Sequence, residues 1–312
     1  MTPFPPASTE AEFDALTREA LLPAVTTLTK SIGLDGTPVV PFTEGSLPVY
    51  AAGEKLVLKL YPPVYADELG TELAMLETLH GRLPIPTPGV EASGEHEGWG
   101  YVLMERLPGR TLAEAWPELS TEDKRRLAPG LGETLAALHA VDDPALAILE
   151  PKDWTEFIAG RRAAAVEHHR ATGLHEDWVA QIPGFLAAVD LGTPKPVPLH
   201  TEFMRDHLMV APGDDGWRLT GLFDFEPAMR GAAEYDFVAT GLFVSSGDAD
   251  FLRRLLLAYG YGPDQLGDDF ARRCLAYTLL HVYSNLPWYL RVMPAPPEPT
   301  LDALARTWWA TA

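Results

Sequence analysis

The sequence predicts an α+β protein with two lobes, a small lobe built on a β-sheet and a larger lobe that is mainly helical. Short apolar runs separated by turn signals fill residues 38–60, a pattern that is typical of strands. After Leu107-Pro108-Gly109 the chain changes to long alanine-rich segments with helical spacing. The length of 312 residues is enough for about two domains. We therefore place the lobes at residues 1–107 and 108–312.

The small lobe is predicted to begin with a helix and to continue with strands, a second helix and a further strand. The first helix is expected over 10–32, because apolar residues recur there with helical spacing. Strands follow within 38–60, where turn signals separate three apolar runs. A second helix is expected over 65–80, where leucines form one stripe, and residues 98–105 are again strand-like.

The large lobe is predicted to be helical apart from one hairpin region at 197–225. Two apolar runs in this region, 208–211 and 217–223, are joined by a turn at 212–216. The remaining segments have helical spacing. Helices are expected at 111–116, 121–141, 153–171, 175–189, 234–259, 266–291 and 300–311.

Charge and composition limit the class of protein. The chain has 24 basic and 44 acidic residues, a formal net charge of −20, which argues against nucleic acid or an anionic membrane as a partner. The charge permits a cationic small molecule. Neither a signal peptide nor an apolar run of the ~18 residues that a transmembrane helix needs is evident. Cys274 is the single cysteine, so we expect a cytoplasmic protein without disulfides, and we expect it to be a monomer.

The hairpin region carries the densest group of reactive side chains. Because a hairpin returns the chain to its starting edge, it should bring Asp224 back beside His207. Carboxylates with apolar neighbours are costly to bury unpaired, so a metal ion or another strong partner is implied. The polar residues expected at the base of the hairpin are His200, Glu202, Arg205, Asp206, His207, Asp224 and Glu226.

The segment from His200 to His207, followed by Phe223-Asp224-Phe225, resembles the aminoglycoside phosphotransferase (APH) branch of the protein-kinase-like fold. That family has the pattern His-x-Asp-x-x-x-x-Asn followed, at the same spacing, by an apolar residue, Asp and an aromatic residue. The resemblance implies a kinase-like two-lobed fold, with a nucleotide-binding small lobe and with the catalytic loop and acceptor site in the large lobe. Two residues depart from the pattern: Glu202 stands for Asp and His207 for Asn.

The resemblance implies a role for each polar residue of the loop region. Glu202 would orient or deprotonate the acceptor hydroxyl, while His207 and Asp224 would bind Mg²⁺. Arg205 would neutralise charge on the transferred phosphoryl group. The loop itself would be supported by His200 and Asp236.

The small lobe would bind the phosphate donor, ATP or GTP. Lys59 in a predicted strand would contact the phosphates, and Glu72 in the next helix would pair with it and hold it in place. The loop around Ser46 could cover the phosphates. The segment 101–109 resembles the hinge of the family, with roles toward the adenine or guanine base for Met104, Glu105 and Leu107.

An aminoglycoside acceptor would need carboxylates for its ammonium groups and an aromatic wall for its sugar faces. The carboxylate candidates are Glu226 and Glu234, with Asp248 and Asp250 as further candidates. The aromatic candidates are Tyr283, Trp288 and Tyr289, although such clusters on a helix are more often part of a core. The stretches Phe42–Tyr61, Gly160–Arg170 and Leu275–His281 resemble those of the actinomycete hygromycin B phosphotransferases.

Three other functions stay open at this level. A kinase of the same fold could act on a small metabolite such as choline, homoserine or a fructosamine. The substitutions at Glu202 and His207 also fit a pseudokinase that binds nucleotide without transferring phosphate. A metal-dependent hydrolase built on the histidines and acids of the loop would leave Lys59 and Glu72 without a role.

Overall fold

A computed structural model describes residues 3–311. The chain forms two compact units, each of which we describe by itself. Unit 1 comprises the residues up to Arg82 together with Pro86–Pro108 and Gly221–Pro227. Unit 2 comprises Leu83–Ile85, Gly109–Thr220 and the residues from Ala228 onward. The division after Pro108 lies next to the predicted boundary, but the prediction did not include the return of residues 221–227 to unit 1.

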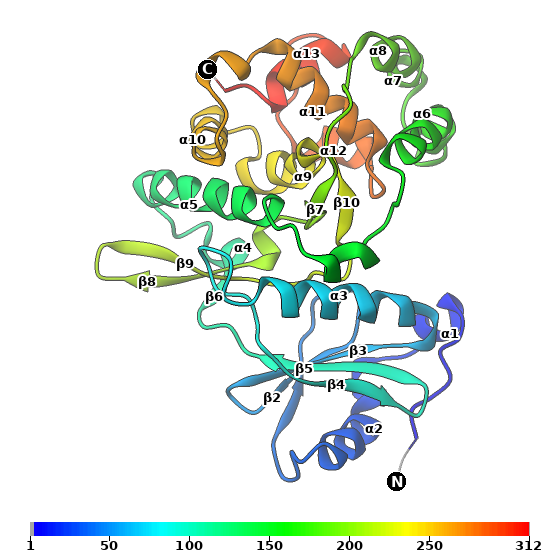
Figure 1. Cartoon of the computed structure of the whole chain (residues 1–312). Helices are drawn as coiled ribbons and strands as arrows, with labels where there is room; N and C mark the ends of the chain where they lie inside the picture. The colour runs from blue at the N-terminus through cyan, green and yellow to red at the C-terminus, as the bar shows by residue number, and fades with distance from the viewer. Residues whose placement is uncertain (1–2, 312) are drawn as a thin grey trace. The chain divides into compact units, whose positions relative to one another are not determined.

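Unit 1 is built on a five-stranded sheet with the strand order β1-β2-β3-β5-β4 (Figure 1). All neighbouring strands are antiparallel. Lys59 in the middle of β3 lies opposite Val49 on one neighbour and Val102 on the other. The strands are β1 (Val39–Pro41), β2 (Val49–Ala52), β3 (Leu56–Tyr61), β4 (Val90–His96) and β5 (Trp99–Glu105).

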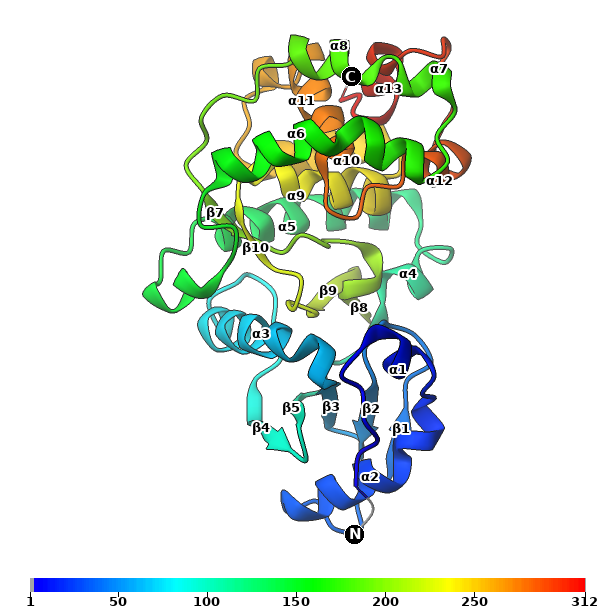
Figure 2. The same cartoon turned by 90° about the vertical axis from the view of Figure 1, so that its right-hand side faces the viewer.

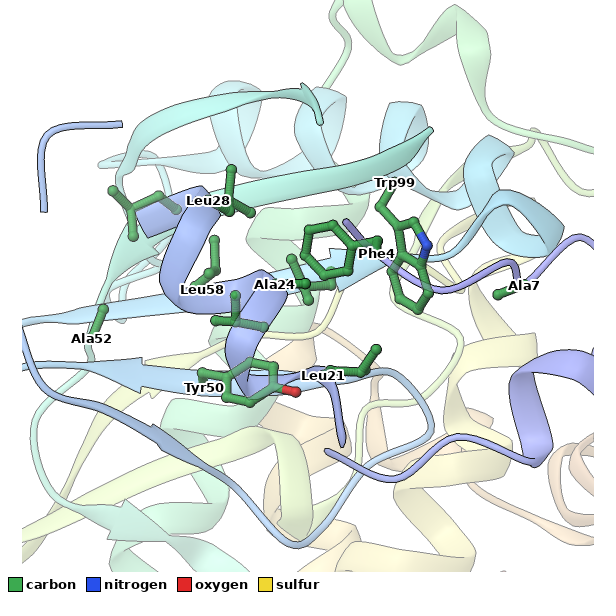
Figure 3. Close-up of a cluster of buried hydrophobic side chains, with 12 residues drawn as sticks. Phe4, Ala7, Leu21, Ala24, Leu28, Tyr50, Ala52, Leu58 and Trp99 are labelled. Atoms are coloured by element: carbon green, nitrogen blue, oxygen red, sulfur yellow. The ribbon is translucent and has the colours of Figure 1, made fainter. Parts of the chain in front are cut away.

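The two faces of this sheet are covered by different helices, because successive residues of a strand point to opposite faces. Leu58 and Leu60 of β3 lie in an apolar core with residues of α2 (Arg18–Ser31), Tyr50 and Trp99. Figure 3 shows Leu58, Tyr50 and Trp99 in this core. Lys59 and Tyr61 face the other side, where α3 (Ala66–Leu79) lies. The alternation of β3 therefore turns its one lysine away from the apolar core and toward the helix.

Two predictions for unit 1 need correction. The helix expected over 10–32 is divided into α1 (Glu10–Asp14) and α2, because the Thr17 side chain accepts a hydrogen bond from the Ala20 N–H and so caps a new helix. The strand β4 was missed. None of its residues is fully buried, so the strand lacks the apolar run by which strands are recognised in a sequence. A short 3₁₀ helix, η1 (Pro63–Tyr65), precedes α3.

Unit 2 is mainly helical, as predicted (Figure 2). Two of its helices, α5 and α10, pack closely at Gly132, where a Cβ atom would lie 2.0 Å from the Leu255 carbonyl oxygen. The helices are α4 (Leu112–Ala115), α5 (Thr121–His139), α6 (Trp154–Ala171), α7 (Glu176–Val179), α8 (Ile182–Ala188), α9 (Ala233–Ala239), α10 (Ala249–Tyr259), α11 (Asp268–Leu280), α12 (Leu286–Val292) and α13 (Leu301–Trp308). Short helical turns are η2 (Pro144–Ile148), η3 (Arg205–His207), η4 (Thr240–Ser245, a π-helix) and η5 (Pro263–Gln265).

The strands of unit 2 frame the predicted catalytic loop. The predicted hairpin is formed by β8 (Leu208–Gly213) and β9 (Gly216–Leu222), and β6 (Arg110–Thr111) pairs with β8. Before the loop, β7 (Val197–Leu199) pairs with β10 (Met229–Gly231), a strand that the sequence pattern did not predict. The loop therefore begins where β7 ends and ends where β8 begins.

Three of the predicted helices in unit 2 are interrupted, and the segment 175–189 is divided into α7 and α8. The segment 234–259 is divided because Asp248 accepts a hydrogen bond from the Phe251 N–H and so caps α10. The segment 266–291 is divided because Asn285 caps α12 in the same way, with Pro287 in the first turn of the new helix. In the last two segments a capping residue ends the helical pattern, although the apolar spacing continues past it.

The predicted α+β class, with a sheet-based N-terminal lobe and a helical C-terminal lobe, is confirmed. None of the helices that the structure describes is both long enough and apolar enough to span a membrane. The predicted location in the cytoplasm stays a prediction.

Candidate active site

The densest group of charges in unit 1 surrounds Lys59. The Lys59 Nζ atom lies 2.7 Å from Glu72 Oε2 and 2.5 Å from Asp224 Oδ1, and it also contacts Glu226 Oε2. The side chains of Lys59 and Glu72 are 5% and 1% exposed, whereas those of Asp224 and Glu226 are 24% and 11% exposed. We call these four residues the Lys59 cluster. Three carboxylates face one ammonium group, so the cluster has negative charge in excess.

The protonation of the cluster follows from this geometry. Burial alone would lower the pKa of Lys59, but the carboxylates of Asp224 and Glu72 outweigh burial and raise it above its usual value. Glu68, one helical turn before Glu72, is also affected by the excess of negative charge. Burial and then the charge of Asp67 raise the pKa of Glu68 to about 6, although the nearby Lys59 acts in the opposite direction. Because the pKa of Lys59 lies above its usual value, Lys59 is charged at neutral pH.

Glu72 is held by three donors. Besides Lys59, the Tyr61 hydroxyl donates to Glu72 Oε2 at 2.9 Å, and the Phe225 N–H donates to Glu72 Oε1 at 3.3 Å. Burial, followed by the charge of Glu72, raises the pKa of Tyr61, so its hydroxyl stays a donor. A buried carboxylate with three hydrogen-bond donors is held in one position, and it holds the ammonium group of Lys59 in place.

Asp224 stands at a strained position of the backbone. Its φ is 74°, in the left-handed region that non-glycine residues rarely adopt. Phe225 next to it is fully buried, and the N–H of Leu222 donates to the Pro86 carbonyl at 3.0 Å, so both sides of Asp224 are anchored. Such strain persists only where the surroundings enforce it. Here it holds the Asp224 carboxylate against Lys59.

The same residues fit a divalent cation. One carboxylate oxygen from each of Glu72, Asp224 and Glu226 lies within 4.8 Å of the others. Carboxylate oxygens are the ligands that Mg²⁺ prefers, and the cluster has more carboxylates than its lysine neutralises. The donor set of unit 1 therefore fits the predicted magnesium.

The predicted catalytic loop of unit 2 is held by Asp236. Its Oδ2 atom accepts a hydrogen bond from the His200 N–H at 2.8 Å, and its Oδ1 atom accepts one from the Thr201 N–H at 2.6 Å. His139 Nε2 lies 2.9 Å from Asp236 Oδ2, and His139 Nδ1 bonds to the Tyr259 hydroxyl. The φ of Thr201 is 73°, so the backbone of the loop turns sharply where Asp236 accepts its hydrogen bonds. This is the geometry that a supporting role for Asp236 requires.

Glu202 and His207 lie at the two ends of the loop's polar segment. His207 Nδ1 donates to the Glu202 carbonyl at 3.0 Å, so the lone pair of the ring is on Nε2, the nitrogen with which His207 could bind a metal. The rings of His200 and His207 stack with centroids 5.9 Å apart. Both of these residues and Glu202 belong to unit 2, whereas Asp224 belongs to unit 1. The predicted sharing of one metal by His207 and Asp224 stays a prediction.

Arg205 makes contacts different from those its predicted catalytic role needs. Its guanidinium stacks on Trp116, with 3.5 Å from Cζ to the ring centroid, and its Nε donates to the Val244 carbonyl at 3.0 Å. Burial lowers the pKa of Arg205 to about 10, a value at which it is still charged at neutral pH. Its predicted role toward the transferred phosphoryl group stays a prediction. The observed contacts tie the loop to α4 and η4.

The other residues predicted to bind nucleotide lie along the sheet of unit 1. Ser46 is exposed in the loop between β1 and β2, and Arg18 donates to the carbonyls of this loop. Met104 is buried in β5. Glu105 ends β5, and its side chain accepts from the Gly89 N–H at 3.2 Å. Leu107 follows β5 and is half-buried. Their roles toward a base stay predictions.

Two carboxylates that were predicted to bind a cationic acceptor are engaged inside the protein. Glu234 forms an ion pair with Arg273, whose Nη2 is 2.7 Å from Glu234 Oε1, and it accepts from the Tyr261 hydroxyl at 3.1 Å. Glu226 contacts Lys59. The pattern of acidic residues in the sequence could not reveal these partners, because each partner comes from a distant segment.

The three aromatic residues predicted for the acceptor line one cavity of unit 2, of about 240 Å³. Glu202 lines the same cavity. The further lining residues were missed as site residues, among them Phe243 and the buried His281. The sequence pattern placed both residues within predicted helices, 234–259 and 266–291, and did not mark them as site residues. The aromatic residues are Tyr283, Trp288 and Tyr289.

Comparison with known proteins places this geometry in a family. The model described as the phosphotransferase enzyme family, APH, matches residues 38–272. A GDP complex of an aminoglycoside 2′-phosphotransferase has a TM-score of 0.71 at 20% identity, over 87% of this chain and 96% of that chain. A macrolide 2′-phosphotransferase from Brachybacterium faecium has a TM-score of 0.63 at 21% identity, over 88% and 99%. At these identities the likeness concerns the fold, and the predicted kinase-like fold is confirmed.

Curated protein sequences also include similar ones. The lysine-specific demethylase JMJ21 of Arabidopsis thaliana is 25% identical over 218 residues, which are 56% of this chain and 23% of that protein. The chain thus spans about a quarter of the length of this relative. The predicted closeness to hygromycin B phosphotransferases stays a prediction.

Proposed function

The chain belongs to the phosphotransferase enzyme family, and from this premise we propose that it transfers the γ-phosphoryl group of ATP or GTP to a hydroxyl group of a small-molecule antibiotic. The observation that carries the proposal is the Lys59 cluster. A buried lysine held by a helix carboxylate, beside an aspartate in a strained turn, is the arrangement that phosphoryl transfer uses to position a nucleotide and its metal.

Unit 1 would bind the donor. Lys59 offers a fixed positive charge to the phosphates, and Glu72 keeps that charge in place. Asp224 and Glu226 would hold Mg²⁺, together with His207 as the family resemblance implies. When bound, Mg²⁺ neutralises the negative charge of the phosphates. Met104, Glu105 and Leu107 would contact the base, and Ser46 the phosphates.

Unit 2 would bind the acceptor and orient its hydroxyl. Glu202 lines the cavity and would accept a hydrogen bond from that hydroxyl, or take its proton as it attacks. Asp236 holds the backbone on which Glu202 stands, so it would act by positioning. Little covalent chemistry is needed from the protein, because orientation and electrostatics supply most of the rate in this reaction class.

The acceptor predicted by resemblance is an aminoglycoside, with hygromycin B as the first to test. The aminoglycoside phosphotransferases with similar folds support this class, and the macrolide phosphotransferase supports a wider one. The departures at Glu202 and His207 keep a nucleotide-binding pseudokinase as the second candidate.

The test is a transfer assay with the purified full chain, Mg²⁺ and either ATP or GTP. Hygromycin B, kanamycin and erythromycin serve as acceptors, and choline, homoserine and a fructosamine represent the small metabolites. Product is measured as a mass increase of one phosphate group, beside nucleoside diphosphate release. Phosphorylation of an antibiotic supports the proposal, whereas turnover of a metabolite alone overturns the acceptor. Tight nucleotide binding without any transfer overturns the enzyme and favours the pseudokinase.

A matched pair of variants links the activity to the cluster. Asp224→Asn removes one charge and keeps a residue that tolerates a positive φ. Asp214→Asn makes the same chemical change on an exposed residue in the turn between β8 and β9. The proposal requires loss of transfer in the first variant and normal transfer in the second.

A further inference from the structure

The loop between β1 and β2, residues 42–48, leaves the sheet of unit 1 next to Lys59. Val49, the first residue of β2, lies opposite Lys59 in the antiparallel register. The Phe42 N–H donates to the Val49 carbonyl at 2.9 Å, which closes the loop at its base. Because paired strands lie about 5 Å apart, a ligand that contacts the backbone beside Lys59 is within reach of this loop. We call it the β1–β2 loop.

One side chain binds three carbonyl groups of the β1–β2 loop. Arg18, the first residue of α2, donates from Nη2 to the carbonyls of Glu44 at 3.2 Å and Leu47 at 3.3 Å. The same nitrogen also donates to the Gly45 carbonyl. A guanidinium group has hydrogen-bond donors and no acceptor, so it binds the carbonyl side of a backbone and leaves the N–H side.

The position of Arg18 is unfavourable within its own helix. The N-terminus of a helix carries partial positive charge, which favours acidic residues in the first turn and disfavours basic ones. The Thr17 side chain already caps α2 by accepting from the Ala20 N–H. The buried Tyr50 hydroxyl donates to the Arg18 carbonyl at 2.8 Å, so the start of α2 is attached to β2. The carbonyls of the β1–β2 loop supply the contacts that compensate a cation at this place.

The N–H groups at the tip of the same loop are not used within the protein. Among residues 3–311, no acceptor lies within hydrogen-bond distance of the N–H groups of Glu44, Gly45 and Ser46, and all three residues are exposed. The φ of Gly45 is 94°, in the positive region. Successive N–H groups in a turn with such a residue form a concave binding site for anions, phosphate oxygens among them.

Resting on the proposed binding of a nucleoside triphosphate by unit 1, we propose that Arg18 is a positioning residue for the phosphates of the donor. It holds the carbonyl side of the β1–β2 loop, so that the N–H groups of Gly45 and Ser46 are directed to the phosphates beside Lys59. Arg18 itself does not touch the nucleotide. Because α2 precedes residues 38–272, which match the family model, this support comes from outside the matched segment.

The test compares a triphosphate with its nucleoside, because only the triphosphate has phosphates for the loop. Calorimetry with the full chain and Mg²⁺ uses ATP and GTP, and adenosine and guanosine up to millimolar concentration. Arg18→Ala should weaken triphosphate binding by about tenfold or more, since the loop is no longer ordered in advance, and should leave nucleoside binding within about twofold. Unchanged triphosphate binding, or equal weakening of both ligands, overturns the proposal.

A matched variant separates the position of Arg18 from its charge. Lys30→Ala removes one positive charge from the other end of α2, where Lys30 forms an exposed ion pair with Asp35. It should leave triphosphate binding within about twofold. A loss as large as that in Arg18→Ala would mean that the net charge of α2 decides the affinity, and would overturn the proposal.

Amide NMR spectra locate the contact. The signals of Gly45 and Ser46 should shift on addition of the triphosphate and much less on addition of the nucleoside, because their N–H groups bind phosphate oxygens. Equal shifts with both ligands, or none with the triphosphate, would overturn the role of the loop.

These outcomes are distinguishable from failure of the proposed function. Triphosphate binding that depends on Arg18, without transfer to any acceptor, would leave the inference standing and refute the transfer. Transfer by a protein whose triphosphate binding does not depend on Arg18 would do the reverse. Binding of neither ATP nor GTP would refute both.

Discussion

Two carboxylate centres of this protein, one in each unit, differ in how their charge is balanced. In unit 1, three carboxylates face the single ammonium group of Lys59. In unit 2, Asp236 is fully buried and is met by two backbone N–H groups and by His139. The Lys59 cluster keeps an excess of negative charge that an added cation can neutralise. The Asp236 carboxylate, in contrast, is already bound by hydrogen-bonding groups of unit 2. Residues of the same chemistry are thus expected to serve function in one place and stability in the other.

The largest effect is expected from Asp224→Asn in unit 1. Loss of one carboxylate should lower the transfer rate by about 10³-fold, as removal of electrostatic stabilisation does in other enzymes. The melting temperature should stay the same or rise, because repulsion among the carboxylates is relieved. Activity assays and thermal unfolding of the same sample test this. Near-normal turnover would show that Asp224 does not bind the metal.

The opposite result is expected from Asp236→Asn in unit 2. The amide has one acceptor oxygen for the three donors that the carboxylate now satisfies, so the free energy of unfolding should fall by about 3 kcal/mol. Urea unfolding measures the change. Asp250→Asn, in an exposed ion pair, is the control and should leave the free energy of unfolding nearly unchanged. If Asp236→Asn altered turnover alone, the supporting role would be wrong.

The pH dependence of stability should report on unit 2. Burial lowers the pKa values of His169 and His281 to about 4, below an unfolded value near 6.5. The unfolded chain therefore binds more protons between these values, and stability is lost as the pH falls from 6.5 toward 4. Each histidine should cost about 2 kcal/mol by pH 5.

This dependence can be measured by urea unfolding at pH 7 and pH 5. The variant His169→Gln is neutral at both pH values, so its loss of stability between them should be smaller by about 2 kcal/mol. An unchanged difference would mean that folding does not lower the pKa of His169.

The smallest effect is expected from Glu234→Gln. Because Glu234 is bound to Arg273, its loss should leave the acceptor KM within about twofold, while the melting temperature falls by a few degrees. Steady-state kinetics with the best acceptor of the panel measure this. A large rise in KM would restore the acceptor-binding role that the acidic pattern predicted for Glu234.

Sequence patterns predicted helices and strands better than they predicted the contact partners of charged side chains. Lys59 and Glu72 were predicted as a pair from the resemblance to the family, and the structure places Lys59 Nζ 2.7 Å from Glu72 Oε2. The partners of Glu226, Glu234 and Arg205 were missed, because Lys59, Arg273 and Trp116 come from distant segments. Helix boundaries failed at Asp248 and Asn285, where a capping side chain outweighed apolar spacing.

The sequence by itself determined the α+β class, the two-part organisation and the family, because strand alternation, helical spacing and the motif from His200 to Asp224 are local properties of the chain. Only the tertiary structure decided which groups surround each carboxylate. Whether an acid is balanced by its own arginine, as Glu234 is, or faces a cavity, as Glu202 does, depends on segments brought together by folding. Coulomb and apolar contacts act over distances in space, and a sequence records only distances along the chain.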